Sequence, residues 1–423
     1  MSGGNLFRKV KGFRDIFGVE ANYWGLVEDI AKRAFRSFGF SEFKLPILER
    51  VEVFDRGIGS STDIVEKEMF VFKDRNEEIL ALRPEGTASL VRAYIENNLN
   101  NPPGVKKYYY YGPMFRRERP QKGRFRQFYQ LGVEVFGSTS PLTDADVINL
   151  LYSFFEKCDI LEYLTLEINS VGCPVCRPSY RDKLVDYLGD KKELLCGDCQ
   201  RRLHTNPLRI LDCKVESCKS ITSLAPLMID NLCGECNEHF NDTKKYLDFM
   251  GIKYVVNPKI VRGLDYYVRT AFEMTTDVLG ASSAVGAGGR YDGLVKTLGG
   301  PDVPGIGFAI GVDRLVDIMM QKDFGLKEQI DLFAVIFDKE SLDNVLPVIN
   351  KLRKDGFSVE FDYETSSIKS QMKKSDRLNA RFAIFFGEDE LKKGVVTIKN
   401  MKNSTQNEVE IEKIAEYLKA QTA

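Results

Sequence analysis

Eight of the nine cysteines in this 423-residue chain lie between residues 173 and 236, most of them in Cys-x-x-Cys pairs. The basic N-terminal residues are not followed by the apolar segment of a secretory signal, so we expect a cytoplasmic chain with reduced thiols. Paired thiols in such a chain are more typical of metal ligands than of disulfides. We therefore expect a small module held together by bound metal, because it is too short for a good hydrophobic core.

The cysteine spacing fits two zinc sites of four thiolates each. The first four cysteines have the expected spacing of one site: Cys173, Cys176, Cys196 and Cys199. The other four could form a second site: Cys213, Cys218, Cys233 and Cys236. The sequence does not reveal which pair joins which, and buried thiols without metal are the alternative. The ninth, Cys158, lies in an apolar helix-like run and is expected in the core.

The composition is that of an ordinary globular protein. Hydrophobic residues make up 43% and charged residues 29%, which excludes collagen-like, disordered and mucin-like chains. Sixty basic and 61 acidic residues give a net charge of −1. This excludes nucleic-acid binding through an overall positive charge, but it does not exclude binding through a local basic groove. No apolar run approaches the ~18 residues of a membrane span. We expect no membrane partner and two or three domains.

Hydrophobic patterning divides the chain into four stretches. Residues 1–170 and 246–325 indicate two parts of one domain, interrupted by the cysteine-rich insertion at 171–245. Residues 331–423 alternate strand-like and helical segments, which predicts a separate α/β domain with a mixed, mostly parallel sheet. The polar residues 321–330 are expected to form a linker between them.

Local periodicity in the first domain predicts particular elements. Apolar residues at three- and four-residue steps predict a helix over 23–38, closed by Gly39. Short strands are expected at 43–45, ending at Pro46, and at 69–72.

A strongly basic segment, residues 116–126, lies between two strand-like runs at 108–111 and 132–136. It contains six basic residues and one acid, a density that favours a nearby anion. Arginine forks bind phosphate oxygens in bidentate fashion, and Phe125, Phe128 and Tyr129 offer ring faces to a base. A solvated basic hairpin is the alternative. Strand, basic turn, strand is the predicted structure in either case.

Two further segments are less specific. Residues 262–267, Arg-Gly-Leu-Asp-Tyr-Tyr, could bind a polar uncharged group, but a buried aromatic strand with a capping arginine explains them as well. Residues 288–293, Gly-Gly-Arg-Tyr-Asp-Gly, lack the spacing of the phosphate-binding glycine loops, so a close-packed glycine strand or turn is expected. The only histidines, His204 and His239, lie in the insertion, which excludes histidine-based catalysis in the main domain.

Taken together, these segments resemble the histidyl-tRNA synthetases, a family of class II aminoacyl-tRNA synthetases, over essentially the full length. Six stretches carry the resemblance in the family's order: GFRDIFG (12–18), LRPEGTASLVRAY (82–94), GPMFRRERPQKGRFRQFYQLGVEVFG (112–137), VRGLDYY (261–267), GGRYDGLV (288–295) and GIGFAIGVDRL (305–315). The resemblance implies an α+β catalytic domain built on an antiparallel sheet of the class II type, with the cysteine-rich insertion, and a C-terminal α/β anticodon-binding domain.

The resemblance also implies an activity and its partners. We expect ATP-dependent activation of L-histidine to histidyl-adenylate, then transfer of the histidyl group to the 3′ end of tRNA(His), with Mg²⁺ as cofactor. The cysteine quartets are not part of the family's catalytic pattern and some members lack them, so the expectation of structural Zn²⁺ rests on their spacing. The segment around Pro46 resembles motif 1, which implies a homodimer. Motif 3 reads Gly-Val-Asp-Arg, where Glu-Arg is commoner in the family, so Asp313 is a mild departure.

Residue roles follow from the matched positions. On the ATP side the resemblance assigns Arg116 and Arg262 to the α-phosphate, as the catalytic pair, Glu118 to the adenine amino group, Phe128 to stacking on adenine and Arg314 to the γ-phosphate. On the histidine side it assigns the α-amino group to Glu85 and Thr87, the amino-acid portion to Gln130 and the imidazole to Glu134 and Tyr267. Tyr266 and Tyr291 are expected to line the same pocket.

The chemistry of these residues agrees with that expectation. Charge builds on the equatorial oxygens of the α-phosphate during activation, and preorganised guanidinium groups and Mg²⁺ stabilise it. The substrate carboxylate is already a nucleophile, so no general base is needed. Imidazole has one donor and one acceptor, which a carboxylate and a phenol can satisfy.

Three other readings compete. A regulatory subunit of ATP phosphoribosyltransferase shares the synthetase core but lacks the C-terminal domain, whereas residues 331–423 are present here. A synthetase for threonine, proline or glycine is disfavoured by VRGLDYY. A pure RNA-binding module would not need the adenylation arginines together with Glu85.

Overall fold

The computed structural model describes residues 7–59, 62, 64–119, 123–261, 264, 266–279 and 283–422. The chain forms two compact units, one of residues 1–16 and 23–324 and the other of residues 17–22 and 325–423. Within the described ranges, the helices are too short or too polar to cross a membrane.

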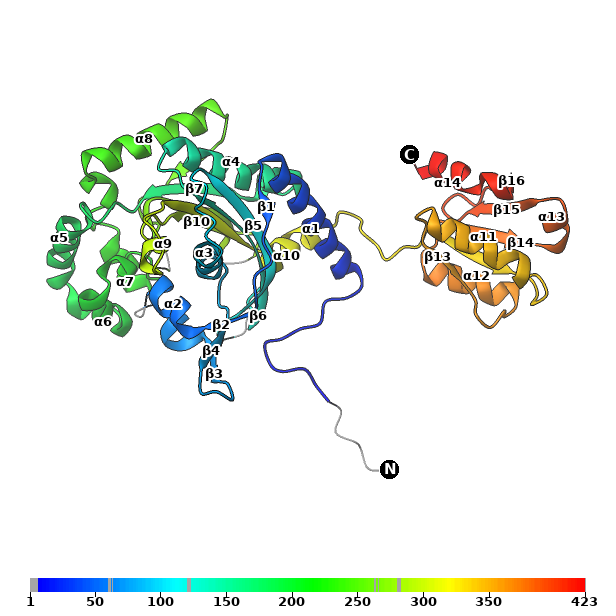
Figure 1. Ribbon diagram of the computed structural model, residues 1–423, viewed down its shortest axis with the longest axis horizontal. Coiled ribbons are helices and arrows are strands. Elements are labelled where there is room, and N and C mark those ends of the chain that lie inside the picture. Colours follow the sequence, from blue (N-terminus) through cyan, green and yellow to red (C-terminus); the bar gives the residue numbers. More distant parts are fainter. Residues whose placement is uncertain are drawn as a thin grey trace. The chain divides into compact units, whose positions relative to one another are not determined.

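The first unit is built on a large sheet that is antiparallel through its middle (Figure 1). The strand order is β1 (Ser41–Glu42), β5 (Lys106–Phe115), β6 (Gln127–Phe136), β11 (Gly305–Gly311), β10 (Ser283–Arg290), β9 (Val268–Thr276), β7 (Thr165–Ser170) and β8 (Val255–Val256). Only the edge strands β1 and β8, among those described, pair in parallel. The expected antiparallel sheet is therefore confirmed, as is the strand, basic turn, strand arrangement of β5 and β6.

Helices cover both faces of this sheet. On one face, Phe35 of α1 (Val19–Ser37) contacts the rings of Tyr109, Phe154 and Phe308, and Phe154 belongs to α4 (Pro141–Lys157). On the other face, Tyr94 of α3 (Thr87–Glu96) stacks on Phe136 with ring centroids 4.3 Å apart. Because side chains alternate along a strand, the two faces carry different residues of the same strands.

Shorter elements complete the first unit. A three-stranded antiparallel sheet, in the order β2 (Leu48–Arg50), β4 (Ile79–Leu82) and β3 (Phe70–Lys73), lies next to α2 (Val51–Ile58) and the π-helical turn Ile64–Glu68. Helix α9 (Leu294–Thr297) follows β10, and α10 (Val312–Lys322) follows β11 directly.

The predicted strand at Phe43–Leu45 was wrong, because regular pairing stops at Glu42 and resumes at Leu48. Pro46 has no N–H to donate to a ladder. The carbonyl oxygens of Leu45 and Pro46 accept hydrogen bonds from the side chain of Arg83 and not from a strand, with Nη1 of Arg83 at 2.9 and 3.2 Å. The predicted helix at 23–38 is confirmed, and Gly39 ends it at a φ of 81°.

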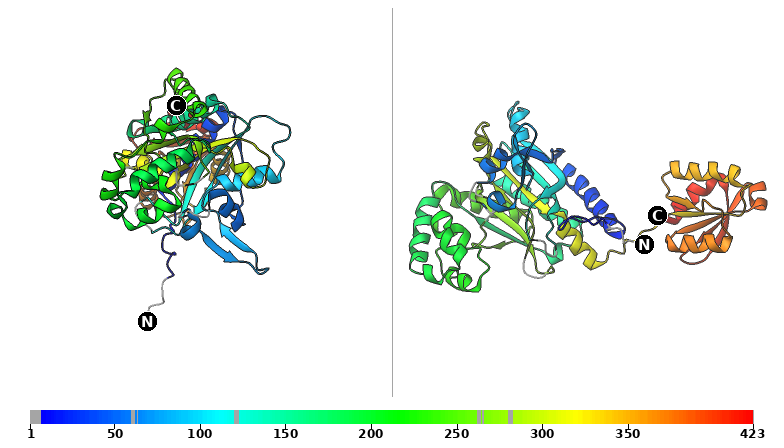
Figure 2. Two further views of the ribbon diagram at one scale, coloured as in Figure 1. Left: turned by 90° about the vertical axis from the view of Figure 1, so that its left-hand side faces the viewer. Right: turned by 90° about the horizontal axis from the view of Figure 1, so that it is seen from below.

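Four helices follow β7: α5 (Arg177–Gly189), α6 (Gly197–Thr205), α7 (Glu216–Thr222) and α8 (Gly234–Phe249). Short 3-10 turns lie before or between them at Leu161–Tyr163, Lys192–Leu194, Pro207–Ile210 and Met228–Asn231. Figure 2 shows these helices, in green, gathered at one end of the unit. Their small core includes Tyr180, Leu184 and Ile210 beside the cysteines. Cys158 lies outside it and is 2% exposed in the main core, as expected.

A buried ion network joins α8 to the main sheet. Asp144 of α4 accepts hydrogen bonds from the Nε atom of Arg290 at 3.1 Å and shares one with Nε2 of His239 at 2.8 Å. The guanidinium of Arg290 is fully buried and also donates to the carbonyl of Ser138. Although burial opposes it, these two partners hold the pKa of Asp144 below its usual value. His239 is thus used structurally.

The second unit is a five-stranded mixed sheet with helices on both faces. Its order is β13 (Val359–Phe361), β12 (Leu332–Ile336), β14 (Phe382–Phe386), β15 (Val395–Asn400) and β16 (Gln406–Glu410). Its helices are α11 (Leu342–Lys354), α12 (Ile368–Arg377), α13 (Glu388–Lys392) and α14 (Ile414–Thr422), the last preceded by a 3-10 turn at Ile411–Lys413. The sheet is mixed, as expected, but it is not mostly parallel: β12 pairs in parallel with β13 and β14, whereas β14 with β15 and β15 with β16 are antiparallel. The short connection between β15 and β16 can join only antiparallel strands.

The alternation along β12 explains why both faces are covered. Leu332, Ala334 and Ile336 pack in the cluster that includes α11 and α14, whereas Phe333 and Val335 pack beside Met372 of α12. All five residues of this strand are buried. Strand β16 and helix α13 were not predicted, because their residues are mostly exposed and polar and give no apolar periodicity.

Candidate active site

A cavity of about 410 Å³ opens on the α3 face of the large sheet. It is lined by eleven of the predicted site residues: Glu85, Thr87, Arg116, Glu118, Phe128, Gln130, Glu134, Tyr266, Tyr267, Tyr291 and Arg314. They come from stretches of chain that span more than two hundred residues, and the sheet brings them to one place. Arg262, also predicted, lies outside the described residues.

Glu134 is a buried residue of the cavity wall. The carboxylate accepts a hydrogen bond from Thr87 Oγ1 at 2.6 Å on one oxygen and from the Tyr291 hydroxyl on the other. The residue is 1% exposed. Burial raises the pKa of Glu134 to about 8, against the two hydrogen bonds, and the nearby Glu85 adds to the rise. A buried carboxylate with a raised pKa in a cavity is typical of a functional group.

A row of small residues makes room for this carboxylate. Across the sheet, Glu134 of β6 is paired with Gly307 of β11, Gly307 with Gly289 of β10, and Gly289 with Ala271 of β9. A Cβ atom on Gly288 would lie 2.2 Å from the carbonyl oxygen of Gly307. Gly288 and Gly289 are therefore close-packed in strand β10, as expected, and Gly293 lies in the turn after it, whereas the strand glycines that line the cavity itself are Gly286, Gly307 and Gly311.

Glu85 and Gln130 complete the polar wall. Both carboxylate oxygens of Glu85 accept from backbone N–H groups at the start of α3, those of Thr87 at 2.7 Å and Ala88 at 2.8 Å. Burial raises the pKa of Glu85 against these bonds and the charge of Arg116. The side-chain oxygen of Gln130 is buried and, among the described residues, has no hydrogen-bond partner. A buried unsatisfied acceptor at a cavity wall is a position for a ligand donor.

The opposite end of the cavity is cationic. Burial lowers the pKa of Arg314, and the neighbouring guanidinium groups of Arg124 and Arg116 lower it further, against Glu118. Arg116 Nη1 lies 3.7 Å and Arg124 Nη1 3.2 Å from Glu118 carboxylate oxygens. The guanidinium carbon of Arg116 lies 5.1 Å from the ring centre of Phe128. Three guanidinium groups around one carboxylate, beside an aromatic ring, suit a polyanionic ligand with a flat base.

Asp313, the departure in motif 3, has a structural role. Its Oδ1 accepts from Arg14 Nη2 and its Oδ2 from the backbone N–H of Tyr129, each at 2.8 Å. It thereby fixes β6 against the start of α10, the helix that carries Arg314. The shorter side chain still reaches both partners.

Sequence reasoning missed other residues of the cavity wall, among them Arg124 and Glu273. Glu273 gave a usable signal, because it is a charge between apolar residues of strand β9. Arg124 lies in the basic segment that was predicted to bind an anion, but it was given no role of its own, whereas Phe125 of the same segment was predicted as a ring face for a base.

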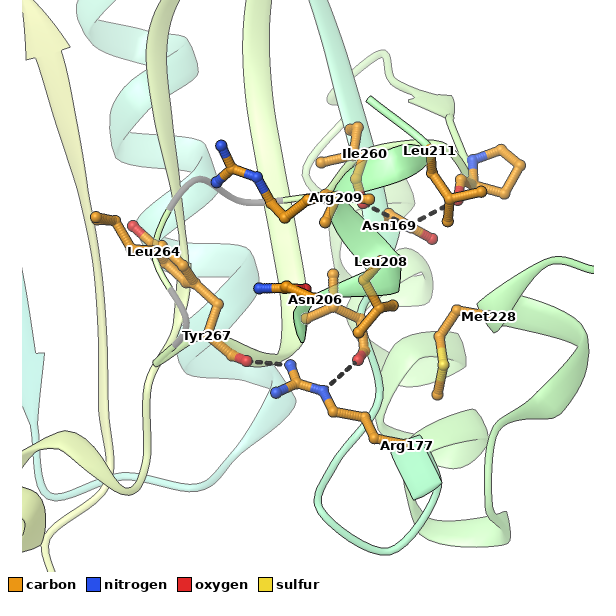
Figure 3. A pocket seen from close by; sticks show the side chains of 13 residues that line it. Asn169, Arg177, Asn206, Leu208, Arg209, Leu211, Met228, Ile260, Leu264 and Tyr267 are labelled. Carbon is orange, nitrogen blue, oxygen red and sulfur yellow. Dashed lines mark hydrogen bonds between the residues drawn. The ribbon is translucent and has the colours of Figure 1, made fainter. Parts of the chain in front are cut away.

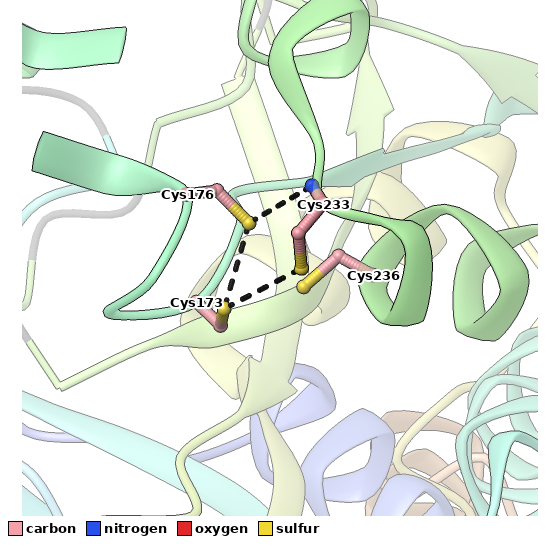
Figure 4. Close-up of side chains that lie close together, drawn as sticks. All are labelled: Cys173, Cys176, Cys233 and Cys236. Carbon is pink, nitrogen blue, oxygen red and sulfur yellow. Dashed lines mark hydrogen bonds between the residues drawn. The ribbon is translucent and has the colours of Figure 1, made fainter. Parts of the chain in front are cut away.

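The cysteines form two clusters, but not in the grouping suggested by spacing. Cluster A joins Cys173 and Cys176 to Cys233 and Cys236, and cluster B joins Cys196 and Cys199 to Cys213 and Cys218. In each cluster the sulfur atoms all lie within 4.8 Å of one another. Along the chain, the two cysteine pairs of cluster A flank the two pairs of cluster B. The pairs of cluster A meet because β7 and α8 bring the two ends of the insertion together. Figure 4 shows the four sulfurs of cluster A facing one another.

Comparison with known proteins agrees with this architecture. Residues 329–421 match the family model of an anticodon binding domain, and residues 12–174 and 222–315 match the model described as histidyl-tRNA synthetase. A catalytic sheet with a cationic and acidic cavity, followed by an anticodon-binding domain, defines an aminoacyl-tRNA synthetase. Most of the cysteine-rich insertion, residues 175–221, lies between the two matched segments.

The chain belongs to the histidyl-tRNA synthetase family. It is 50% identical to the histidine–tRNA ligase of Geobacter sulfurreducens, over 95% of this chain and 96% of that one. It is also 50% identical to that of Thermodesulfovibrio yellowstonii, over 97% of each chain. The crystal structure of apo histidyl-tRNA synthetase from S. aureus superimposes with a TM-score of 0.81 at 34% identity, covering 98% of this chain and 100% of that one.

Proposed function

We propose that this chain, a cytoplasmic ligase, activates L-histidine with ATP to histidyl-adenylate and transfers the histidyl group to the 3′ end of tRNA(His). The observation that carries the proposal is the cavity itself, with a buried acid–phenol end and an arginine end. The first suits an imidazole and the second a triphosphate.

On the histidine side, Glu134 and Tyr267 contact the imidazole nitrogens. Tyr266 and Tyr291 form the wall, with their ring centroids 5.7 Å apart. Gln130 contacts the amino-acid portion, and Glu85 with Thr87 binds the α-amino group. An apolar analogue of histidine would leave Glu134 buried without a donor from the substrate, so such analogues are rejected strongly.

On the ATP side, Arg116 holds the α-phosphate and Arg262 reaches it from the opposite side. Glu118 accepts from the adenine amino group, Phe128 stacks on adenine and Arg314 binds the γ-phosphate. The histidine carboxylate attacks the α-phosphorus, pyrophosphate leaves, and fixed guanidinium groups stabilise the charge that builds on the phosphate oxygens. Mg²⁺ would supply further positive charge to the phosphates when bound, and Glu273 is a carboxylate of the cavity wall that would hold such an ion.

The C-terminal unit supplies the tRNA-binding surface. Beside a hollow of about 440 Å³ lie Phe361, Tyr363 and Arg377. The Tyr363 side chain is 75% exposed, and its ring centre lies 4.7 Å from that of Phe361. Exposed rings next to cations are suited to stacking on unpaired bases.

The chain works as a homodimer. The small sheet of the first unit leaves Leu48, Val71, Phe72 and Ile79 each more than 40% exposed. Clustered exposed apolar side chains indicate a protein interface. This sheet follows the segment around Pro46 that resembles motif 1. A monomer in light scattering at micromolar concentration would contradict the dimer.

Clusters A and B each hold one structural zinc ion. Four thiolates at Zn–S distances of about 2.3 Å place their sulfurs roughly 3.8 Å apart. In cluster A the Sγ of Cys173 lies 3.5 Å from that of Cys176 and 3.9 Å from that of Cys233, and in cluster B Cys196 and Cys213 are 3.9 Å apart.

The decisive experiment is amino-acid-dependent ATP–pyrophosphate exchange, with histidine, threonine, proline and glycine tested separately. We expect exchange with histidine alone. Exchange with another amino acid would identify the chain as a synthetase for that amino acid. No exchange with any of them, from folded dimeric protein with Mg²⁺ present, would indicate a non-catalytic paralogue.

A further inference from the structure

Arg177 connects the cysteine-rich insertion to the cavity wall. It is the first residue of α5 and directly follows Cys176 of cluster A. Its Nε donates to the carbonyl oxygen of Val171 at 3.0 Å, and its Nη2 donates to the carbonyl oxygen of Tyr267 (Figure 3). One guanidinium group thus joins the end of β7 to the segment that enters β9.

The residue held in this way belongs to the proposed histidine pocket. Tyr267 is 7% exposed, and its ring centre lies 4.6 Å from that of Tyr266. Behind its ring lies Gly289, where a Cβ atom would be 2.8 Å from Tyr267 Cδ1. The ring therefore has little room, and its position depends on where the backbone of Tyr267 is held.

Cluster A determines the position of Arg177. The backbone N–H groups of Cys176 and Arg177 both donate to the carbonyl oxygen of Cys173 at 3.1 Å, forming the turn that carries the first two thiols. Cys233 donates from its backbone N–H to the Sγ of Cys176 at 3.3 Å. If the four thiols of cluster A are held in place, the backbone that carries Arg177 is therefore held in place as well.

We propose that Arg177 is a positioning residue for histidine binding, through which an intact cluster A holds Tyr267 in place. This role rests on the proposed function, because it concerns the histidine end of the same cavity. Arg116, Glu118, Phe128 and Arg314 of the ATP end lie on other segments, whereas Arg262, proposed on the α-phosphate, shares the segment of Tyr267. We therefore expect a larger effect on histidine binding than on ATP binding. The insertion then does more than stabilise itself: it completes the wall of the amino-acid pocket.

The test compares Arg177→Ala and Arg177→Lys with Arg181→Ala in the full-length enzyme. Arg181 is one turn further along α5 and donates to the carbonyl of His204 within the insertion, which makes it a matched control. The readouts are the KM for histidine and for ATP in pyrophosphate exchange, histidine affinity by calorimetry, zinc content and thermal unfolding.

For Arg177→Ala we expect the KM and Kd for histidine to rise about tenfold, as for the loss of a charge-assisted hydrogen bond. The KM for ATP should stay within twofold, with zinc content and melting temperature close to wild type. Arg177→Lys should recover part of the affinity, because it keeps one donor. Arg181→Ala should match wild type.

An unchanged histidine KM in Arg177→Ala, or an equal rise for ATP and histidine, would overturn the proposal. A second variant, Cys233→Ser, tests the connection to cluster A: it should lose about one zinc per chain and raise the histidine KM in the same way. Loss of that zinc with an unchanged KM would separate the cluster from Arg177. Failure of the wild-type enzyme to exchange with histidine would instead refute the proposed function.

Discussion

Gly307 provides the space that the carboxylate of Glu134 occupies. A Cβ atom on Gly307 would lie 1.9 Å from Glu134 Oε2 and 2.2 Å from the carbonyl oxygen of Val133. The two residues are direct partners on neighbouring antiparallel strands, 173 positions apart in the chain. Neither the carboxylate nor the backbone behind it can move without breaking hydrogen bonds.

Gly307→Ala should therefore displace Glu134 from Thr87 and Tyr291. We expect histidine-dependent exchange to fall by about 100-fold or more, on the scale of losing a preorganised polar group in an active site. The control is Gly293→Ala, where a Cβ atom meets nothing within 4 Å. Wild-type histidine KM in a folded Gly307→Ala enzyme would contradict this account of the pocket.

Glu134→Gln tests the raised pKa of Glu134. The ordinary pKa of the carboxyl is 4.5 and burial raises it to about 8, so between these values the folded ligand-free chain binds a proton that the unfolded chain has lost. The contribution of this proton to the free energy of unfolding is then fully present below pH 4.5 and is lost as pH rises through about 8. The glutamine variant does not titrate, so its stability relative to wild type should increase over this window. Denaturant unfolding at several pH values measures it, and a constant difference would refute the shift.

Arg116→Ala should reduce the rate of adenylation by about 100-fold or more, because it removes one fixed charge donor from the α-phosphate. Pre-steady-state formation of histidyl-adenylate measures this rate. Arg117 is the exposed neighbour outside the cavity, so Arg117→Ala serves as control. The family resemblance predicts the same loss for Arg262→Ala. A rate within threefold of wild type for either arginine would exclude its proposed role.

Metal analysis of protein purified without chelator should find about two zinc ions per chain, one for each cluster. Removal should unfold the insertion, since a four-thiolate site supplies folding energy to a small module. Cys176→Ser should lose the ion of cluster A and Cys199→Ser that of cluster B. Less than about 0.3 zinc per chain in the wild type would argue that the thiols are simply buried.

Binding of tRNA should weaken at least about tenfold between 50 and 200 mM salt, because lysine and arginine contacts to phosphates release counterions. Filter binding or fluorescence anisotropy with tRNA(His) measures it. The KM for histidine should be nearly constant over the same range, since its pocket is buried. A flat salt dependence of tRNA binding would count against a phosphate-tracking surface.

Local patterns predicted part of the elements correctly, but not the helices of the cysteine-rich insertion. The spacing of apolar residues located α1, β5, β6 and the alternating elements of the C-terminal unit, because a buried face imposes its period on neighbouring residues. The same reasoning failed for Phe43–Leu45, because the carbonyl oxygens of Leu45 and Pro46 accept hydrogen bonds from the side chain of Arg83 and not from a strand. It also missed the exposed β16.

The sequence by itself determined the chemical inventory and its order. It carries the arginines, the paired thiols, the tyrosines after Arg262 and a main domain without histidine, and their order along the chain identifies the family. Such information is local, since it depends on which residue types lie next to one another.

Only the tertiary structure decided which distant groups meet. Spacing favoured joining Cys173 to Cys196, yet the fold joins Cys173 to Cys233, because β7 and α8 bring the ends of the insertion together. Glu134 is a buried acid only because Gly307 leaves space for its carboxylate. Arg177 supports the pocket only because its guanidinium group reaches the carbonyl oxygen of Tyr267. These relationships depend on strand register and on which distant segments lie side by side. Both arise from packing across the whole unit, so no periodic pattern in the sequence reveals them.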